Sequence, residues 1–157
     1  MTRTAPLAIA AAAIALAGCG GGETTASSSR YPQVVERSQF IREAKAICRD
    51  SSKDRSRRIG AFYELRARET GEPEGLVGAV DAVPVVIVPS LKRELRELEA
   101  IGLPKGEAYE AEAVLQTLRT VLHEVEAEGI YAWRSAKLLP PFRNRARPFG
   151  LQHCVVN

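Results

Sequence analysis

The feature that most constrains the fold of this chain is the spacing of its apolar residues, which recur every three or four positions over three long segments. This spacing places them on one side of an α-helix, because each residue turns the helix by about 100°. The first segment extends from Ser38 to about Arg68 and contains the apolar residues Phe40, Ala44, Ile47, Cys48, Ile59, Phe62 and Leu65. The pattern predicts an amphipathic helix that ends in the Gly- and Pro-containing stretch Thr70–Gly75.

The second segment, residues 76–101, gives two conflicting signals. Val83–Pro89 has the β-branched composition of a strand and contains two prolines. The helical spacing nevertheless continues through both prolines, at Leu76, Val80, Val83, Ile87, Leu91, Leu95 and Leu98. A strand here would also have no evident partner in the chain. We therefore predict a helix kinked near Pro84 and leave open whether it is one helix or two.

The third segment follows a turn at Gly102–Gly106, and its apolar positions are Ala111, Val114, Leu118, Val121, Val125, Ala132, Ala136 and Leu139. Pro140 and Pro141 predict its end near Leu139, although Gly129 allows an earlier break. Short loops between long helices favour antiparallel neighbours. The predicted fold is therefore all-α, an up-down-up bundle of three long helices with a C-terminal tail or short fourth helix packed back on the first helix.

The first 18 residues have the composition of an export signal. Arg3 supplies a positive charge ahead of Leu7–Ala17, an uninterrupted run of Leu, Ile and Ala. At about 11 residues, this run is shorter than the roughly 20 that a permanent transmembrane helix needs, so we expect it to be removed after export. The run ends in Leu16-Ala17-Gly18-Cys19, which resembles the lipobox of bacterial lipoproteins.

The lipobox resemblance implies that Cys19 becomes the first mature residue and carries a diacylglycerol, with acyl chains such as palmitate. Two such chains make a lasting anchor, at about 0.8 kcal/mol per buried CH₂. The Gly/Ser/Thr stretch through Ser29 predicts a flexible tether with a reach of about 20 Å. We expect a signal peptide over residues 1–18, the lipidated cysteine and tether over 19–33, and one helical-bundle domain over 34–157. An ordinary signal peptide that happens to end in Cys is the alternative.

Cys48 and Cys154 are the two remaining cysteines, and disulfides persist in exported proteins. They lie 106 positions apart, and a bridge between them would stabilise the fold by about 4.7 kcal/mol on the chain-entropy estimate. The alternative is a metal or redox pair that includes His153. Because CxxC is absent and one adjacent His is a poor ligand set, we favour the disulfide and expect no metal or cofactor.

Several short motifs together resemble small uncharacterised cell-surface lipoproteins of high-GC actinobacteria. These motifs are the lipobox, the Ser/Gly tether, Ala46-Ile47-Cys48 in the first helix and the closing Gly150–Cys154. The resemblance implies a location on the outer face of the cell membrane, attached by lipid. It implies no known activity.

No sequence motif points to catalysis. A Gly-rich phosphate loop, HExxH, GxSxG and SxxK are all absent, and neither His123 nor His153 belongs to a Glu-x-x-His pair of the di-iron type. The formal charge of +3, from 22 basic and 19 acidic residues, is too balanced to indicate a nucleic-acid partner. We predict a non-enzymatic interaction or envelope-structural module whose partners are the membrane and an envelope protein or small anion.

Four polar residues, Ser51, Ser52, Arg55 and Arg58, interrupt the apolar side of the first helix. A buried arginine needs a carboxylate or a bound anion. Two carboxylates, Glu94 and Glu107, fall on the core lines of their own helices and are candidate internal partners, and snorkelling at the core boundary is a further possibility. The alternative function is therefore small-solute or anion binding by Arg55 and Arg58, because arginine suits bidentate recognition.

The opposite side of the first helix carries a basic stripe formed by Arg42, Lys45, Arg49, Lys53 and Arg57. Three more arginines, Arg143, Arg145 and Arg147, lie near the C-terminus. Near an anionic leaflet, each such residue adds about 1 kcal/mol of attraction. A solvated helix face without a partner is the simpler interpretation of the same pattern.

Overall fold

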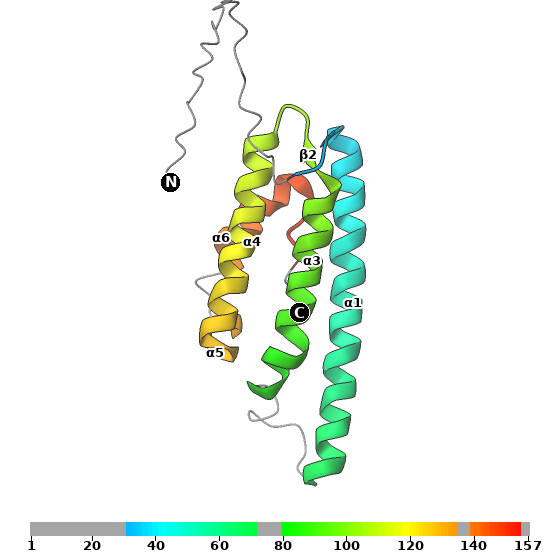
Figure 1. The fold of residues 1–157 in the computed structure, drawn as a ribbon, viewed down its shortest axis with the longest axis vertical. Helices are drawn as coiled ribbons and strands as arrows, with labels where there is room; N and C mark the ends of the chain where they lie inside the picture. The colour runs from blue at the N-terminus through cyan, green and yellow to red at the C-terminus, as the bar shows by residue number, and fades with distance from the viewer. Residues whose placement is uncertain (1–30, 72–79, 135–138, 155–157) are drawn as a thin grey trace, which may run out of the picture.

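The computed structural model describes residues 31–71, 80–134 and 139–154, and every long element within these ranges is a helix. Three helices form the body of the domain: α1 (Arg37–Thr70), α3 (Val88–Ile101) and α4 (Ala108–Glu128). Helix α3 lies between α1 and α4 and contacts both (Figure 1). The all-α prediction is confirmed.

Helix α1 has nearly the bounds that its apolar spacing predicts. It ends where Gly71 adopts the left-handed conformation, with φ of 69°, and the Gly71 N–H donates to the carbonyl of Ala67. Glycine takes this conformation without the clash of a Cβ atom, so it is the usual residue after a helix end. The predicted stop in Thr70–Gly75 is therefore correct, and residues 72–79 lie outside the described ranges.

The second segment, in which strand composition and helical spacing disagree, is helical over its described residues 80–101. Residues 80–82 lead into the π-helical turn η1 (Val83–Ile87), which continues directly into α3. Pro84 and Pro89 cannot donate backbone hydrogen bonds, and a widened π turn accommodates the missing bonds without ending the helix. The kink predicted near Pro84 thus takes the form of a π turn in one continuous helical path.

The third helix does not run to Leu139 and ends instead at the earlier break that Gly129 allows. Helix α4 ends at Gly129, which has φ of 64°, and is followed by the short α5 (Ile130–Arg134). The next described helix, α6 (Leu139–Ala146), contains Pro140 and Pro141, and the residues before it, 135–138, lie outside the described ranges. The two prolines therefore do not stop the helix that contains them, which continues to Ala146.

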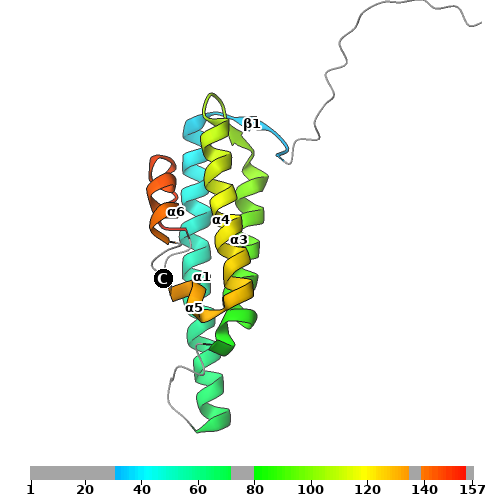
Figure 2. The ribbon, with the colours of Figure 1, turned by 90° about the vertical axis from the view of Figure 1, so that its left-hand side faces the viewer.

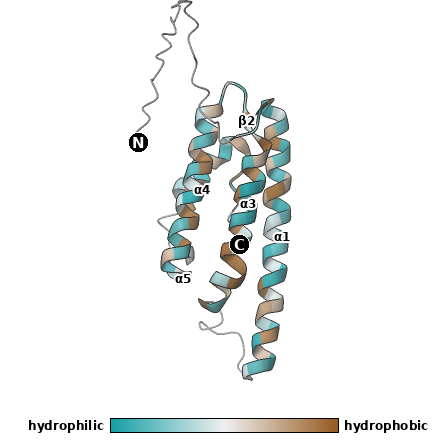
Figure 3. Ribbon diagram, viewed as in Figure 1, coloured by the Kyte–Doolittle hydropathy of each residue, from teal (hydrophilic) through white to brown (hydrophobic). Residues whose placement is uncertain are grey.

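The C-terminal part of the chain returns along the body of the domain. Helix α6 packs against α4, and the 3₁₀ turn η2 (Arg147–Phe149) contacts α1 (Figure 2). The Phe149 ring meets the fully buried Phe40 ring edge to face, with 5.9 Å between the ring centroids. Figure 3 shows helices with distinct hydrophobic and hydrophilic sides, as the spacing of apolar residues predicts.

A small element that the sequence pattern does not predict ties the start of the domain to a loop. Strand β1 (Val34–Val35) pairs in parallel with β2 (Leu103–Pro104), and the Leu103 N–H donates to the Gln33 carbonyl at 3.0 Å. Gly102 makes this approach possible. Its φ is 96°, and an added Cβ would lie 2.2 Å from the Gln33 carbonyl oxygen.

Candidate functional site

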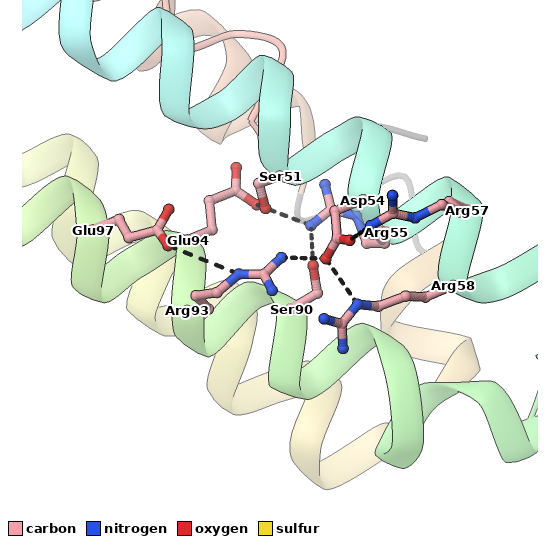
Figure 4. A network of polar contacts seen from close by, with 9 residues as sticks. All are labelled: Ser51, Asp54, Arg55, Arg57, Arg58, Ser90, Arg93, Glu94 and Glu97. Carbon is pink, nitrogen blue, oxygen red and sulfur yellow. Dashed lines mark hydrogen bonds and ion pairs between the residues drawn. The ribbon is translucent and has the colours of Figure 1, made fainter.

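A closed polar layer lies between α1 and α3. Its four members are Ser51 and Arg55, one turn apart on α1, and Ser90 and Glu94, one turn apart on α3 (Figure 4). Arg55 and Glu94 are both 0% exposed and form an ion pair, with Nη1 and Oε2 2.9 Å apart. The Ser51 hydroxyl donates to the same Oε2 at 3.0 Å, and Arg55 Nη1 donates to the Ser90 hydroxyl at 3.4 Å.

The internal partner of Arg55 is therefore Glu94, one of the two carboxylates that the sequence suggests. The other, Glu107, lies directly before α4 and pairs with Arg37 at 2.8 Å. Arg37 also donates to the Pro148 carbonyl, so this surface pair joins the start of α1 to the C-terminal segment. Burial of the Arg55 charge is tolerated because Arg55 pairs with the Glu94 carboxylate and donates to the Ser90 hydroxyl.

A second group of charges continues this layer to the surface around Asp54. Its carboxylate accepts from Arg93 at 2.6 Å and from Arg57 at 2.5 Å, and it pairs with Arg58 at 2.8 Å. The hydrogen bond from Arg93, with the further arginines, lowers the pKa of Asp54 to about 2. Arg58 belongs to this surface group, since its side chain is 55% exposed. Arg55 and Arg58 thus face different surroundings and are each held by a carboxylate of the protein.

The disulfide between Cys48 and Cys154 is present and lies in the core. Both residues are at most 1% exposed, and their Cα atoms are 4.6 Å apart. The bridge holds the C-terminal tail against the middle of α1. Gly150 passes so close to the first half of α1 that an added Cβ would lie 2.1 Å from the Lys45 Cε atom.

This return of the tail creates a groove beside α1. The groove has a volume of about 850 Å³, and its lining residues from α1 include Arg42, Lys45, Arg49 and Lys53. The tail supplies Gly150, Gln152 and His153 as the opposite wall. Among the described residues, neither Arg42 nor Lys45 has an ion-pair partner, and Arg49 pairs with Asp50 at 2.9 Å. We call this feature the cationic groove.

A second hollow of about 500 Å³ shares Gln152 and His153 with the cationic groove and adds Arg143, Asn144 and Arg147 from the C-terminal segment. Within the described part of the chain, no Asp or Glu lines either hollow. Six arginines and lysines therefore gather along one face. The sequence indicates the basic stripe and the C-terminal arginines separately. Their meeting depends on the path by which the tail returns to α1, and the predicted disulfide fixes that path only at Cys154.

One set of potential metal ligands occurs within the described residues. The sulfurs of Cys48 and Cys154 and a carboxylate oxygen of Glu94 lie within 4.8 Å of one another, and all three residues are buried. The metal or redox pair with His153 that the sequence leaves open is a different set, because His153 is exposed and does not belong to this one. Cys19, the predicted lipid attachment site, lies outside the described residues.

Comparison with known proteins gives no relative. No protein-family model, no curated protein and no solved structure matches the chain. Within residues 31–71, 80–134 and 139–154, no helix has both the length and the apolar character that a membrane span needs.

Proposed function

We propose that this protein is a lipid-anchored domain on the outer face of the cell membrane that binds anionic groups of an envelope component without chemical turnover. The observation that carries the proposal is the cationic groove, where four basic side chains of α1 face a tail that adds no carboxylate among its described residues. Phosphate and carboxylate groups are the chemistry that such a lining recognises.

The anchor part of the proposal rests on the Leu16–Cys19 motif and the tether after it. A tether with a reach of about 20 Å would keep the domain close to the leaflet that holds its lipid. At that distance, about 1 kcal/mol of attraction per basic residue favours anionic partners at the membrane surface. The disulfide is consistent with an oxidising location.

The proposal treats the domain as an up-down-up bundle of three long helices whose C-terminal segment returns to the first. Support comes from the Cys48–Cys154 bridge and from the Arg37 contact with the Pro148 carbonyl, which join α1 to that segment at two places. In such a bundle, the groove wall is a covalently fastened tail and the groove floor is a rigid helix. A preformed site loses little entropy on binding.

Anion binding by Arg55 and Arg58 is the alternative version of this function. The Arg55–Glu94 pair is closed to solvent at 0% exposure, so a solute would have to separate α1 from α3 to reach it. The cationic groove requires no such opening. Removing Arg58 separates the two versions, because Arg58 does not line the groove.

Pyrophosphate titration monitored by thermal unfolding tests the groove, with the full chain carrying Cys19→Ser in detergent and at constant ionic strength. A ligand at 100 times its Kd stabilises by about 2.7 kcal/mol. We expect Arg42→Gln/Lys45→Gln to lose this stabilisation. The matched control Arg96→Gln/Lys105→Gln removes the same charge from exposed positions outside the groove and should still be stabilised by pyrophosphate.

If pyrophosphate stabilises the two double variants equally, anion binding in the groove is rejected. If Arg58→Gln alone removes the stabilisation, binding by Arg55 and Arg58 is favoured.

The anchor has its own test. Expressed with an export pathway, the wild-type chain should sediment with membranes and carry the mass of acyl chains at Cys19. The Cys19→Ser chain should carry no acyl mass and should not be processed at residue 18. Wild-type protein without acyl mass would rule out lipidation, whatever the result for the groove.

A further inference from the structure

The buried carboxylate of Glu94 has one oxygen engaged and one that points elsewhere. Oε2 accepts from Ser51 and pairs with Arg55. Oε1 is buried and has no hydrogen-bond partner among the described residues. Buried oxygens without partners are uncommon in folded proteins, so the environment of Glu94 Oε1 needs a physical explanation. A metal ion bound jointly by Glu94 and the sulfurs of Cys48 and Cys154 would give this oxygen a partner.

We propose that Cys48, Cys154 and Glu94 form a zinc site when the disulfide is reduced. Zinc bound by thiolates and a carboxylate has metal–ligand distances of about 2.0 to 2.3 Å, which places the ligand atoms about 3 to 4 Å apart. The three atoms already lie within 4.8 Å of one another. Small side-chain adjustments therefore suffice to bring the three ligand atoms to these separations.

The chemistry balances with a dithiol or phosphine as the reductant. Two electrons and two protons convert the Cys48–Cys154 bridge into two thiols. A dithiol supplies both electrons and both protons and becomes a cyclic disulfide. A phosphine supplies the two electrons, and a water molecule gives it the oxygen of the phosphine oxide and supplies the two protons. Zinc then forms two Zn–S bonds and one Zn–O bond, and both thiol protons pass to solvent. The metal and the disulfide thus compete for the same two sulfurs.

The charge of the surroundings fits this ligand set. Two thiolates and one carboxylate around Zn²⁺ give a net charge of −1, and the buried Arg55 guanidinium supplies the balancing positive charge. Arg55 and Ser51 also hold Glu94 Oε2, so Oε1 is the oxygen free to coordinate. Outer partners that orient a ligating carboxylate in this way strengthen metal binding.

The cationic groove provides the route to the site. Cys48 is one of the residues that line the groove, although it is only 1% exposed. Three protein ligands leave the fourth position of tetrahedral zinc to a water or another exchangeable ligand, as in zinc sites that remain open. That position would face the groove.

Spectroscopy with Co²⁺ and competition for Zn²⁺ test the proposal. The full chain carrying Cys19→Ser, so that its thiols are those of Cys48 and Cys154 alone, is reduced with a phosphine in detergent. We expect one equivalent of Co²⁺ to produce thiolate-to-cobalt charge transfer and intense tetrahedral ligand-field bands, and Zn²⁺ to displace it. The oxidised chain should give neither signal. Absence of these signals from the reduced chain would overturn the site.

Variants separate the roles of the ligands, with helical content checked by circular dichroism. Cys48→Ser should abolish the charge-transfer band. Ser51→Ala keeps both buried charges but loosens the Glu94 carboxylate, so we expect about 10- to 100-fold weaker zinc binding. Arg55→Met/Glu94→Leu replaces the pair with apolar side chains and should weaken binding further. His153→Ala is the control and should bind as the parent does. Binding unchanged in the Ser51 and Glu94 variants would show that the thiols act without the carboxylate and would reject the three-ligand site.

Discussion

Arg55 and Glu94 are fully buried in the core, and the charge of each compensates for the desolvation of the other. A buried ion pair gives little net stability, since desolvation offsets the attraction between the charges. Loss of one partner is costly, because it leaves a charge in an apolar interior.

We therefore expect Arg55→Met alone to lower the free energy of unfolding by about 3 to 5 kcal/mol. Arg55→Met/Glu94→Leu should lose much less, since no charge stays behind. Urea unfolding at neutral pH measures both. If the single and double variants lose the same free energy of unfolding, the destabilisation by Arg55→Met does not come from an unpaired Glu94 charge.

Asp54 should make stability depend on pH in the acid range. Its pKa is about 2 in the folded protein against an ordinary 3.8, so the folded state favours the carboxylate. The resulting stabilisation is complete above about pH 4 and disappears as the pH falls towards 2. Allowing for screening by solvent, we expect about 1 to 2 kcal/mol, which Asp54→Asn removes at pH 7. The comparison variant Asp50→Asn, at an exposed pair, should change acid unfolding less.

At the scale of elements, helix positions follow from sequence periodicity, while helix ends depend on local chemistry. The spacing of apolar residues identifies α1 and favours a helix over a strand at Val83–Ile87. The spacing continues through Gly129, so the end of α4 is indicated only by that glycine, as the earlier of the two possible ends. Proline is an ambiguous signal, because it can end one helix or lie in the first turn of the next. Pro140 and Pro141 lie within α6. The pairing of β1 with β2 involves two residues each, too few to leave a pattern.

That small pairing depends on Gly102. Gly102→Ala forces a Cβ to within 2.2 Å of the Gln33 carbonyl oxygen at a φ of 96°, and we expect a loss of about 1 to 3 kcal/mol in thermal or urea unfolding. Gly60→Ala is the matched control. Gly60 lies inside α1 with open space around it, so alanine should stabilise by about 0.5 to 1 kcal/mol. Similar effects at both positions would mean that β1 contributes little.

At the scale of the whole molecule, the disulfide determines the shape of the candidate site, because it places the tail as one wall of the cationic groove. The sequence predicts the Cys48–Cys154 bridge and the internal partner of Arg55, each from residue type and position. The predicted bridge brings the tail to the first helix, but the groove also depends on the path of residues 150–153 beside Arg42 and Lys45, which residue type and spacing do not specify.

Reduction in the presence of a chelator should therefore loosen the groove as well as destabilise the fold. We expect a loss of up to about 4.7 kcal/mol in unfolding free energy. Faster amide hydrogen exchange at residues 150–154 should accompany it, together with weaker pyrophosphate binding. Full retention of both exchange protection and binding in Cys48→Ala/Cys154→Ala would show that packing of Phe142, Phe149 and Leu151 is enough to hold the tail.

The charged pair in the core also limits how α1 and α3 can slide past one another. Moving either helix by one turn, about 5.4 Å, would bring the guanidinium of Arg55 opposite Leu91 or Leu98, both fully buried. Apolar side chains alone would tolerate several such alignments, since leucines are interchangeable along a helix face. The Arg55–Glu94 pair therefore favours a single alignment of the two helices, although it adds less stability than apolar side chains in the same places would.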